Sequence, residues 1–287
     1  MARLNMARRS MAGLFDPVVL QQSLFDQALG QASGDPSGPS DPLGPSWFEE
    51  DQLPLFDYVF DAPAESFAIA GSKRWLQVAI NRAPELLNEA LRPLLPLQAH
   101  EQVAWRSPRA ITGFREYRDM RALRQLGIHS LPQRPLRTFW PVGGPMWDAL
   151  AKTSGGQFIF LEAKAHLAEA ASPGTGASDW ARGLICKSLC EARQHYAPAS
   201  RANWSGTYYQ YANRLAHHYL FHTLNGLPSH LVFLYFLNAA EMHGPTSPWQ
   251  WERTIRRLHR ALGLPHRFQP PRVHDVFLDV TLLSDLL

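Results

Sequence analysis

The feature that most constrains the fold is a short apolar run, Phe158-Ile-Phe-Leu161, which is followed directly by charged residues. Runs rich in aromatic and β-branched residues favour a β-strand. Side chains alternate along a strand, so Phe158 and Phe160 face one side while Ile159 and Leu161 face the other. Because both faces are apolar, both must be covered, and we predict a central strand of a sheet between two layers.

Charged side chains stand at the end of this predicted strand. Glu162 and Lys164 are two residues apart and therefore share one face, whereas Ala163 faces away. Charged groups in such a place must be paired, face a solvated cleft or bind a metal. Asp148 precedes Glu162 by fourteen residues. That separation fits a second strand and a turn that returns beside the first.

This arrangement suits metal-assisted hydrolysis of phosphodiesters. Mg²⁺ prefers hard oxygen ligands, usually one or two carboxylates together with waters and substrate phosphate. Asp148 and Glu162 supply two carboxylates, and the carbonyl of Ala163 offers a third oxygen. Lys164 can orient or deprotonate the attacking water and offset charge on the phosphate. The alternative is a structural ion pair, because an acid-x-lysine triplet is a weak motif by itself.

Several segments together resemble the PD-(D/E)XK nuclease superfamily, and within it a family of uncharacterised bacterial proteins. The resemblance covers roughly residues 66–282 and is carried by Glu116-Tyr-Arg-Asp, Phe139-Trp-Pro, Gly144-Pro-Met-Trp-Asp-Ala-Leu, Glu162-Ala-Lys-Ala-His and Tyr208-Tyr-Gln-Tyr-Ala-Asn-Arg-Leu-Ala-His217. Asp148 takes the place of the first acidic residue of the motif, Glu162 the second and Lys164 the lysine. Glu116 fits the acidic residue that the superfamily often carries on a helix before the first strand. Trp147 departs from the pattern, which has proline there.

The resemblance implies an α/β protein with a restriction-endonuclease-like fold, in which helices flank a mixed β-sheet core, with a helical N-terminal extension. It further implies a nuclease that depends on Mg²⁺ or Mn²⁺ and cleaves nucleic acid, with DNA as the favoured substrate. Some members of the superfamily have lost catalysis. An inactive protein of the same fold that binds nucleic acid or a partner protein is therefore the alternative.

Further candidate residues follow the strand motif. Gln210, Asn213 and Arg214 share one face of a predicted helix. Some branches of the superfamily carry glutamine and tyrosine on a helix beside the active site, so Gln210 is a candidate for catalysis, and Asn213 and Arg214 for substrate binding. The alternative is a polar surface face. His166 would share the Lys164 face and contact phosphate, or merely end the strand.

The basic residues are concentrated in the second part of the chain. Residues 1–100 carry seven basic and twelve acidic groups, and residues 101–287 carry twenty-one basic and thirteen acidic groups. An excess of positive charge around the motif suits a polyanionic substrate. Arg256 and Arg260 belong to a basic stripe on a predicted amphipathic helix, which could contact phosphates or simply face solvent.

Domain organisation follows from composition. Residues 1–65 form a predicted flexible extension and linker, in which residues 30–65 are rich in Gly, Pro, Ser and Asp and residues 18–28 are a possible short helix. Residues 66–287 form the predicted nuclease-like domain. The start shows no secretory signal, and no apolar stretch is long enough for a membrane helix. With cysteines only at positions 186 and 190, these features indicate a cytoplasmic protein.

The periodicity predicts the order of elements. Helices are expected over 72–91 with a break near Pro84, and over 109–126, 181–196, 208–225 and 249–262; strands are expected over 136–140, 147–151, 158–165, 230–237 and 273–280. His217, His218 and His222 raise the possibility of zinc, but such a site needs further ligands, and core or surface histidines are favoured.

Overall fold

The computed structural model describes residues 67–98 and 100–286. The predicted extension over 1–65, with its possible helix, lies outside these residues, so the division into two regions stays a prediction. The longer helices are α2 (Gly71–Arg82), α3 (Pro84–Leu91), α4 (Asp119–Gln125), α5 (Leu136–Phe139), α6 (Asp179–Tyr196), α7 (Tyr209–His218) and α8 (Pro248–Leu262). Short turns of helix are η2 (Ala110–Thr112), η3 (Leu167–Ala170), η4 (Tyr219–Leu224), η5 (Ala240–Met242), η6 (Val280–Leu282) and η7 (Ser284–Leu286).

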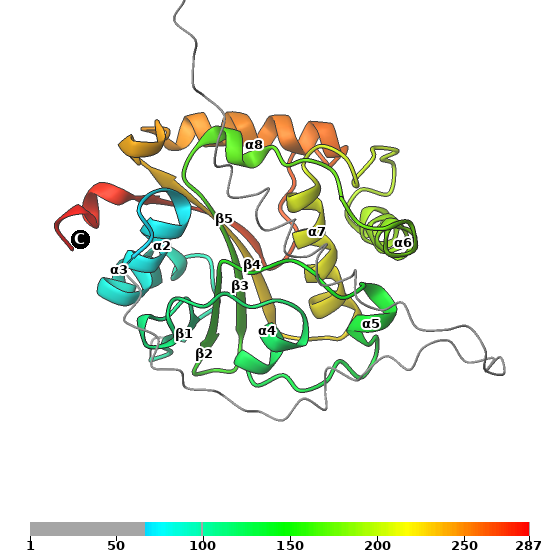
Figure 1. Cartoon of the computed structure of the whole chain (residues 1–287), viewed down its shortest axis with the longest axis horizontal. Helices are drawn as coiled ribbons and strands as arrows, with labels where there is room; N and C mark the ends of the chain where they lie inside the picture. Colours follow the sequence, from blue (N-terminus) through cyan, green and yellow to red (C-terminus); the bar gives the residue numbers. More distant parts are fainter. Residues whose placement is uncertain (1–66, 99, 287) are drawn as a thin grey trace, which may run out of the picture. The chain divides into compact units, whose positions relative to one another are not determined.

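Five strands form one mixed sheet in the order β1-β2-β3-β4-β5 (Figure 1). They are β1 (Val103–Ser107), β2 (Ala149–Thr153), β3 (Phe158–Lys164), β4 (Ser229–Leu237) and β5 (Val273–Asp279). The first three pair antiparallel, whereas β4 lies parallel to β3 and β5 parallel to β4. The prediction of an α/β fold whose mixed sheet is flanked by helices is confirmed at this level.

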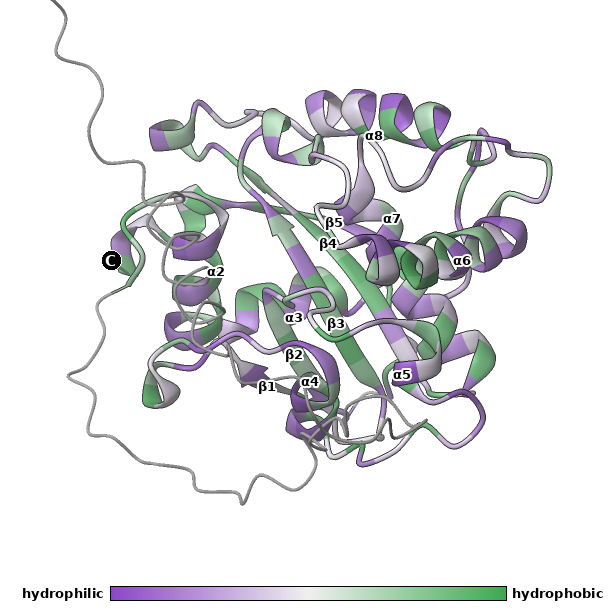
Figure 2. Cartoon of the chain, turned by 45° about the vertical axis from the view of Figure 1, so that its right-hand side comes forward, coloured by the Kyte–Doolittle hydropathy of each residue, from purple (hydrophilic) through white to green (hydrophobic). Residues whose placement is uncertain are grey.

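Helices cover both faces of β3, as its doubly apolar sequence predicts. Ile159 and Leu161 pack against residues of α2 and α3, whereas Phe160 packs in a second cluster with α4 to α8. Figure 1 shows α2 and α3 on one side of the sheet and α6 and α7 on the other. In Figure 2 the central strands are largely hydrophobic, while α8 carries both hydrophilic and hydrophobic residues. β3 is therefore a central strand with polar side chains at its end, as its sequence predicts.

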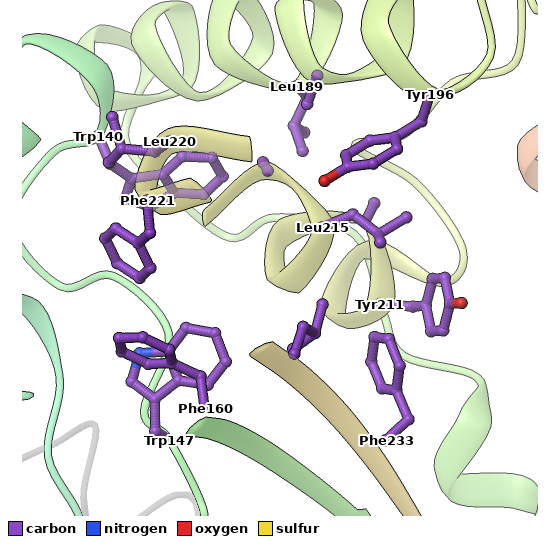
Figure 3. Packing of buried hydrophobic residues seen from close by; sticks show 14 of the residues in the cluster. Trp140, Trp147, Phe160, Leu189, Tyr196, Tyr211, Leu215, Leu220, Phe221 and Phe233 are labelled. Atoms are coloured by element: carbon purple, nitrogen blue, oxygen red, sulfur yellow. The ribbon is translucent and has the colours of Figure 1, made fainter. Parts of the chain in front are cut away.

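Helix α7 fills the space between α6 and the sheet (Figure 3). Tyr211 on α7 stacks on Phe233 of β4 with ring centroids 4.2 Å apart, and Trp147 lies 5.0 Å from Phe160 of β3. Leu215 is completely buried between these layers. This packing fixes the orientation of α7, and with it the polar side chains that α7 directs toward the end of β3.

Two predicted elements are wrong. The strand expected over 136–140 is instead the short helix α5 over 136–139, followed by Trp140, because Leu136, Phe139 and Trp140 follow helical spacing and all pack into one core cluster. The helix expected over 109–126 exists only as α4, since Gly113 and Phe114 adopt left-handed backbone conformations that interrupt it. Glu116 consequently lies in an extended segment and not on a helix.

Strand β1 is absent from the predicted elements. Its sequence, Val103-Ala-Trp-Arg-Ser107, contains one charged residue and few strongly apolar ones, so its periodicity is weak. Its pairing with β2 gives the strand its conformation. The break expected near Pro84 is confirmed, because Pro84 begins α3 directly after α2. No helix within the described ranges has the length and apolar character needed to cross a bilayer.

Several histidines lie in the core, which is one of the two positions that the sequence favoured for them. His218 Nδ1 and the Tyr196 hydroxyl form a hydrogen bond of 2.7 Å, and His230 Nδ1 lies 3.0 Å from His274 Nε2. Burial lowers the pKa of His218 to about 3, with a further contribution from His222, and burial together with Arg272 lowers that of His230 to about 3. Both imidazoles are thus uncharged in the folded protein at neutral pH.

These shifts predict a loss of stability in acid. Histidines in the unfolded chain bind protons near pH 6.5, whereas His218 in the folded protein does so only near 3. The free energy of unfolding should therefore be fully retained above about pH 7 and fall as the pH drops from about 6.5 toward 3. Urea titrations at pH 7.5, 6 and 5 measure the fall. His218→Gln should lessen the loss of stability in acid, whereas His266→Gln, a change at an exposed histidine, should not. If the free energy of unfolding fell equally with pH in all three proteins, His218 would not be a source of the acid sensitivity.

Candidate functional site

The hairpin of β2 and β3 brings two carboxylates together. Ala149 pairs antiparallel with Leu161, so the next position outward places Asp148 beside Glu162. Asp148 Oδ2 accepts a hydrogen bond from the Ala163 amide at 2.8 Å. Both backbone groups of a strand residue point to the same edge, so the Ala163 carbonyl also faces the Asp148 side. Two carboxylates and one carbonyl oxygen thus meet at the end of β3.

An isolated β-bridge between Tyr117 and Trp147 brings a third carboxylate, that of Glu116, close to Asp148. Tyr117 pairs antiparallel with Trp147, and the Trp147 amide donates to the Tyr117 carbonyl at 3.0 Å. The adjoining positions on these two segments are Glu116 and Asp148. Glu116 also lies 3.6 Å from Lys73 of α2. Glu116 therefore comes to the site from an extended segment, which corrects its expected position on a helix.

Glu162 is enclosed by two cations. Its side chain is 2% exposed. Oε1 forms an ion pair with Lys164 Nζ, and Oε2 accepts a hydrogen bond from Arg214 Nε at 2.8 Å. Lys164 Nζ also donates to Gln210 Oε1 at 2.9 Å. Both oxygens of the Glu162 carboxylate are thus occupied, and α7 supplies two of the groups that organise the end of β3.

Arg214 is held from several directions at once. Its Nη1 donates to Asn213 Oδ1 at 2.9 Å and its Nη2 donates to the Met146 carbonyl at 2.7 Å. The guanidinium carbon lies 4.9 Å from the centre of the Trp147 ring, a cation–π distance. Trp147, which departs from the superfamily pattern, therefore supports the arginine that pairs with Glu162.

The surroundings set the charge of each carboxyl group. Although Asp148 is only half-buried as a residue, burial of its carboxyl group and the nearby charge of Glu162 raise its pKa to about 7. Burial alone would raise the pKa of Glu162, but Arg214 and Lys164 together outweigh it and the net pKa is lowered. Burial raises the pKa of Glu116, against the opposing charge of Lys73. Asp148 is thus the least compensated of the three acids.

A cavity with about 20 Å³ of space for water borders the ion pair. That space suffices for one water molecule. Glu162, Lys164 and Gln210 form its polar wall, and its other walls are Ala170, Tyr211, Phe233, Tyr235 and Leu258. The cavity can therefore hold a water molecule beside the Lys164 side chain.

The remaining candidates lie apart from this cluster. His166 Nε2 is 3.1 Å from Glu169 Oε1 where η3 begins. Arg256 and Arg260 lie on the exposed face of α8, whereas Leu258 on its buried face lines the cavity. Arg256 pairs with Glu252 at 3.4 Å. Any role for the two arginines therefore concerns the outer surface and not the carboxylates.

Three further groups support the site although the sequence assigned them no role in it. Lys73 on α2 pairs with Glu116, the Met146 carbonyl accepts from Arg214, and the Trp147 ring supports Arg214. Lys73 is more than forty residues from Glu116 in the chain, and a backbone carbonyl has no sequence signature. Only the replacement of proline by Trp147 in the motif could have drawn attention to that position.

The donor atoms suit a hard divalent cation. Mg²⁺ binds one or two carboxylates and completes its shell with water and phosphate oxygens. Asp148, Glu162 and the Ala163 carbonyl would provide such a set. Burial and, after it, the charge of Glu162 raise the pKa of Asp148, and a cation would offset the second of these two causes. The described part of the chain contains no group of three or more His, Cys, Asp or Glu side chains arranged to hold a metal. A third protein ligand for the ion would therefore be the backbone carbonyl oxygen of Ala163 rather than another side chain.

Comparison of the chain with protein-family models, with curated proteins and with solved structures finds no match.

The electrostatics of Asp148 predict a stabilising substitution. Its pKa is 3.8 unperturbed and about 7 in the folded protein, so ionisation favours the unfolded chain. Asp148→Asn should therefore be more stable than wild type, with an advantage that is absent near pH 4, grows with pH and levels off above about 7. A plateau of about 1–2 kcal/mol is expected, since the residue is half-buried. Urea titrations across this range check it, with Asp179→Asn on exposed surface as control; a pH-independent difference would contradict it.

Proposed function

We propose that the protein is a cytoplasmic nuclease of the PD-(D/E)XK superfamily that depends on Mg²⁺ or Mn²⁺ and cleaves nucleic acid, with DNA favoured. The observation that carries the proposal is the meeting of Asp148, Glu162, the Ala163 carbonyl and Lys164 at the end of two paired strands. Three hard oxygen donors beside an ammonium group are the parts that metal-assisted phosphodiester hydrolysis needs.

The sheet supports a restriction-endonuclease-like fold. An antiparallel unit of β1, β2 and β3 continues into the parallel strands β4 and β5, with helices on both faces. The motif residues lie at the ends of neighbouring strands, where side chains can leave the core without losing their rigid support. This agrees with the resemblance seen in the sequence.

Asp148, Glu162 and the Ala163 carbonyl are the residues that would hold the ion. When bound, the ion supplies positive charge that polarises the phosphorus centre and favours ionisation of water. The hydrogen bond from the Ala163 amide keeps Asp148 against β3. Its carboxyl group is then positioned before any ligand arrives, so little ordering is needed on binding.

Lys164 has two contacts suited to catalysis. Gln210 Oε1 accepts from its ammonium at 2.9 Å and directs it toward the carboxylates, and the water-sized cavity adjoins it. An ammonium in this position orients the attacking water and offsets negative charge that develops on the phosphoryl oxygens. Gln210 acts through Lys164 and is therefore a positioning residue.

The rival function also has an observation in its favour. Both Glu162 oxygens are already paired with cations, and such a closed ion-pair network can serve structure alone. The rival is a catalytically inactive protein of the same fold that binds nucleic acid or a partner. It differs from the nuclease in having no divalent requirement.

The nuclease proposal predicts that Lys164 matters for cleavage and little for binding. Lys164→Ala should lose cleavage by at least about a hundredfold, because the group acts mainly in the transition state. Lys164→Arg should not restore it, and Gln210→Ala should lose less. Single-turnover cleavage of labelled DNA and RNA with Mg²⁺ or Mn²⁺, beside filter binding, measures both. The exposed Lys187→Ala is the matched control, and undiminished cleavage by Lys164→Ala would refute the assignment.

The basic face of α8 predicts a second measurable effect. If Arg256 and Arg260 contact phosphates, their joint replacement by alanine should weaken binding equally for all nucleic-acid sequences. The slope of log affinity against log salt concentration should become shallower by about two, roughly one for each lost phosphate contact. The control replaces Arg82 and Arg92, exposed arginines of the opposite helical layer. Equal losses in both double variants would leave α8 without a specific role.

A further inference from the structure

The buried cluster contains no surplus of negative charge. Glu162 is matched by two cations, Lys164 and Arg214, and Asp148 lies beside Glu162 just before the paired strand β2. Glu116 is matched in turn by Lys73. Three carboxylates, on Asp148, Glu162 and Glu116, thus face three cations. A divalent cation that entered this cluster would meet no net negative charge, although its ligands are of the right kind.

The two cations on Glu162 differ in how they are held. Arg214 is 4% exposed and contacts Glu162, the Asn213 side chain, the Met146 carbonyl and the Trp147 ring. A guanidinium with partners on all sides cannot leave without stranding several polar groups. Arg214 is therefore a fixed charge.

Lys164 is the movable cation of the pair. Its side chain is 13% exposed, it has two hydrogen-bond partners, Glu162 and Gln210, and it borders the cavity. A flexible stem allows its ammonium to swing from Glu162 Oε1 toward a nearby anion. The motion would release one carboxylate oxygen while Arg214 continues to hold the other.

We propose that Arg214 is a resident cation that makes metal binding depend on the nucleic acid. This inference rests on the nuclease function proposed above and concerns the order of assembly. The fixed charge of Arg214 keeps the affinity of the free protein for divalent ions low. A substrate phosphate supplies the missing negative charge and attracts Lys164 away from Glu162, so ion and phosphate bind together. The coupling is reciprocal, and the ion must strengthen nucleic-acid binding by the same factor.

Mn²⁺ binding to the free protein tests the proposal without any turnover. Titrations followed by the electron paramagnetic resonance of free Mn²⁺ compare wild type, Arg214→Met and Arg214→Lys, each checked for folding by near-ultraviolet circular dichroism. Arg214→Met removes the charge and should bind Mn²⁺ at least tenfold more tightly than wild type. Arg214→Lys keeps the charge and should bind as weakly as wild type. Adding Glu162→Gln to Arg214→Met should abolish the gain.

A second measurement covers the case in which Arg214→Met does not fold. Filter binding of wild type to a phosphorothioate DNA duplex, with and without Mn²⁺, should show at least tenfold tighter binding with the ion, and Asp148→Asn should lose this difference. The inference would be overturned if the free wild-type protein bound Mn²⁺ tightly and neither Arg214→Met nor the duplex changed that affinity. In that case, cleavage that depends on Lys164 would still support the nuclease function. Failure of every variant to bind Mn²⁺ or to cleave would overturn both.

Discussion

The ion pair between Glu162 and Arg214 is the contact on which the site depends. It joins the end of β3 to α7 inside the protein, where a carboxylate without a partner would be costly. Arg214 in turn binds the Met146 carbonyl, which lies just before Asp148. One guanidinium thus fixes a strand, a helix and the segment that carries the first acidic residue.

The same contact helps to set the charge of the two neighbouring carboxyl groups. Arg214 and Lys164 lower the pKa of Glu162, whereas burial and the charge of Glu162 raise the pKa of Asp148, which accepts a hydrogen bond from the Ala163 amide. The two neighbouring carboxyl groups therefore differ in their affinity for protons, because two cations hold Glu162.

Prediction from the sequence succeeded where the pattern was local. The doubly apolar run of β3 identifies a central strand, and the spacing of Asp148 to Glu162 identifies a hairpin, which the pairing of Ala149 with Leu161 confirms. It failed for residues 136–140, where aromatic content suggested a strand. The helical spacing of Leu136, Phe139 and Trp140 lets one short turn bury all three side chains.

By itself, the sequence determined the α/β class, the central strand and the face shared by Glu162 and Lys164, because alternation along a strand depends only on backbone geometry. Tertiary structure alone decided which partners these charges have. Arg214 is fifty-two residues from Glu162 and Lys73 is distant from Glu116. Their contacts depend on how α7 and α2 pack against opposite faces of the sheet. That packing is set by many weak apolar contacts, which no short motif records.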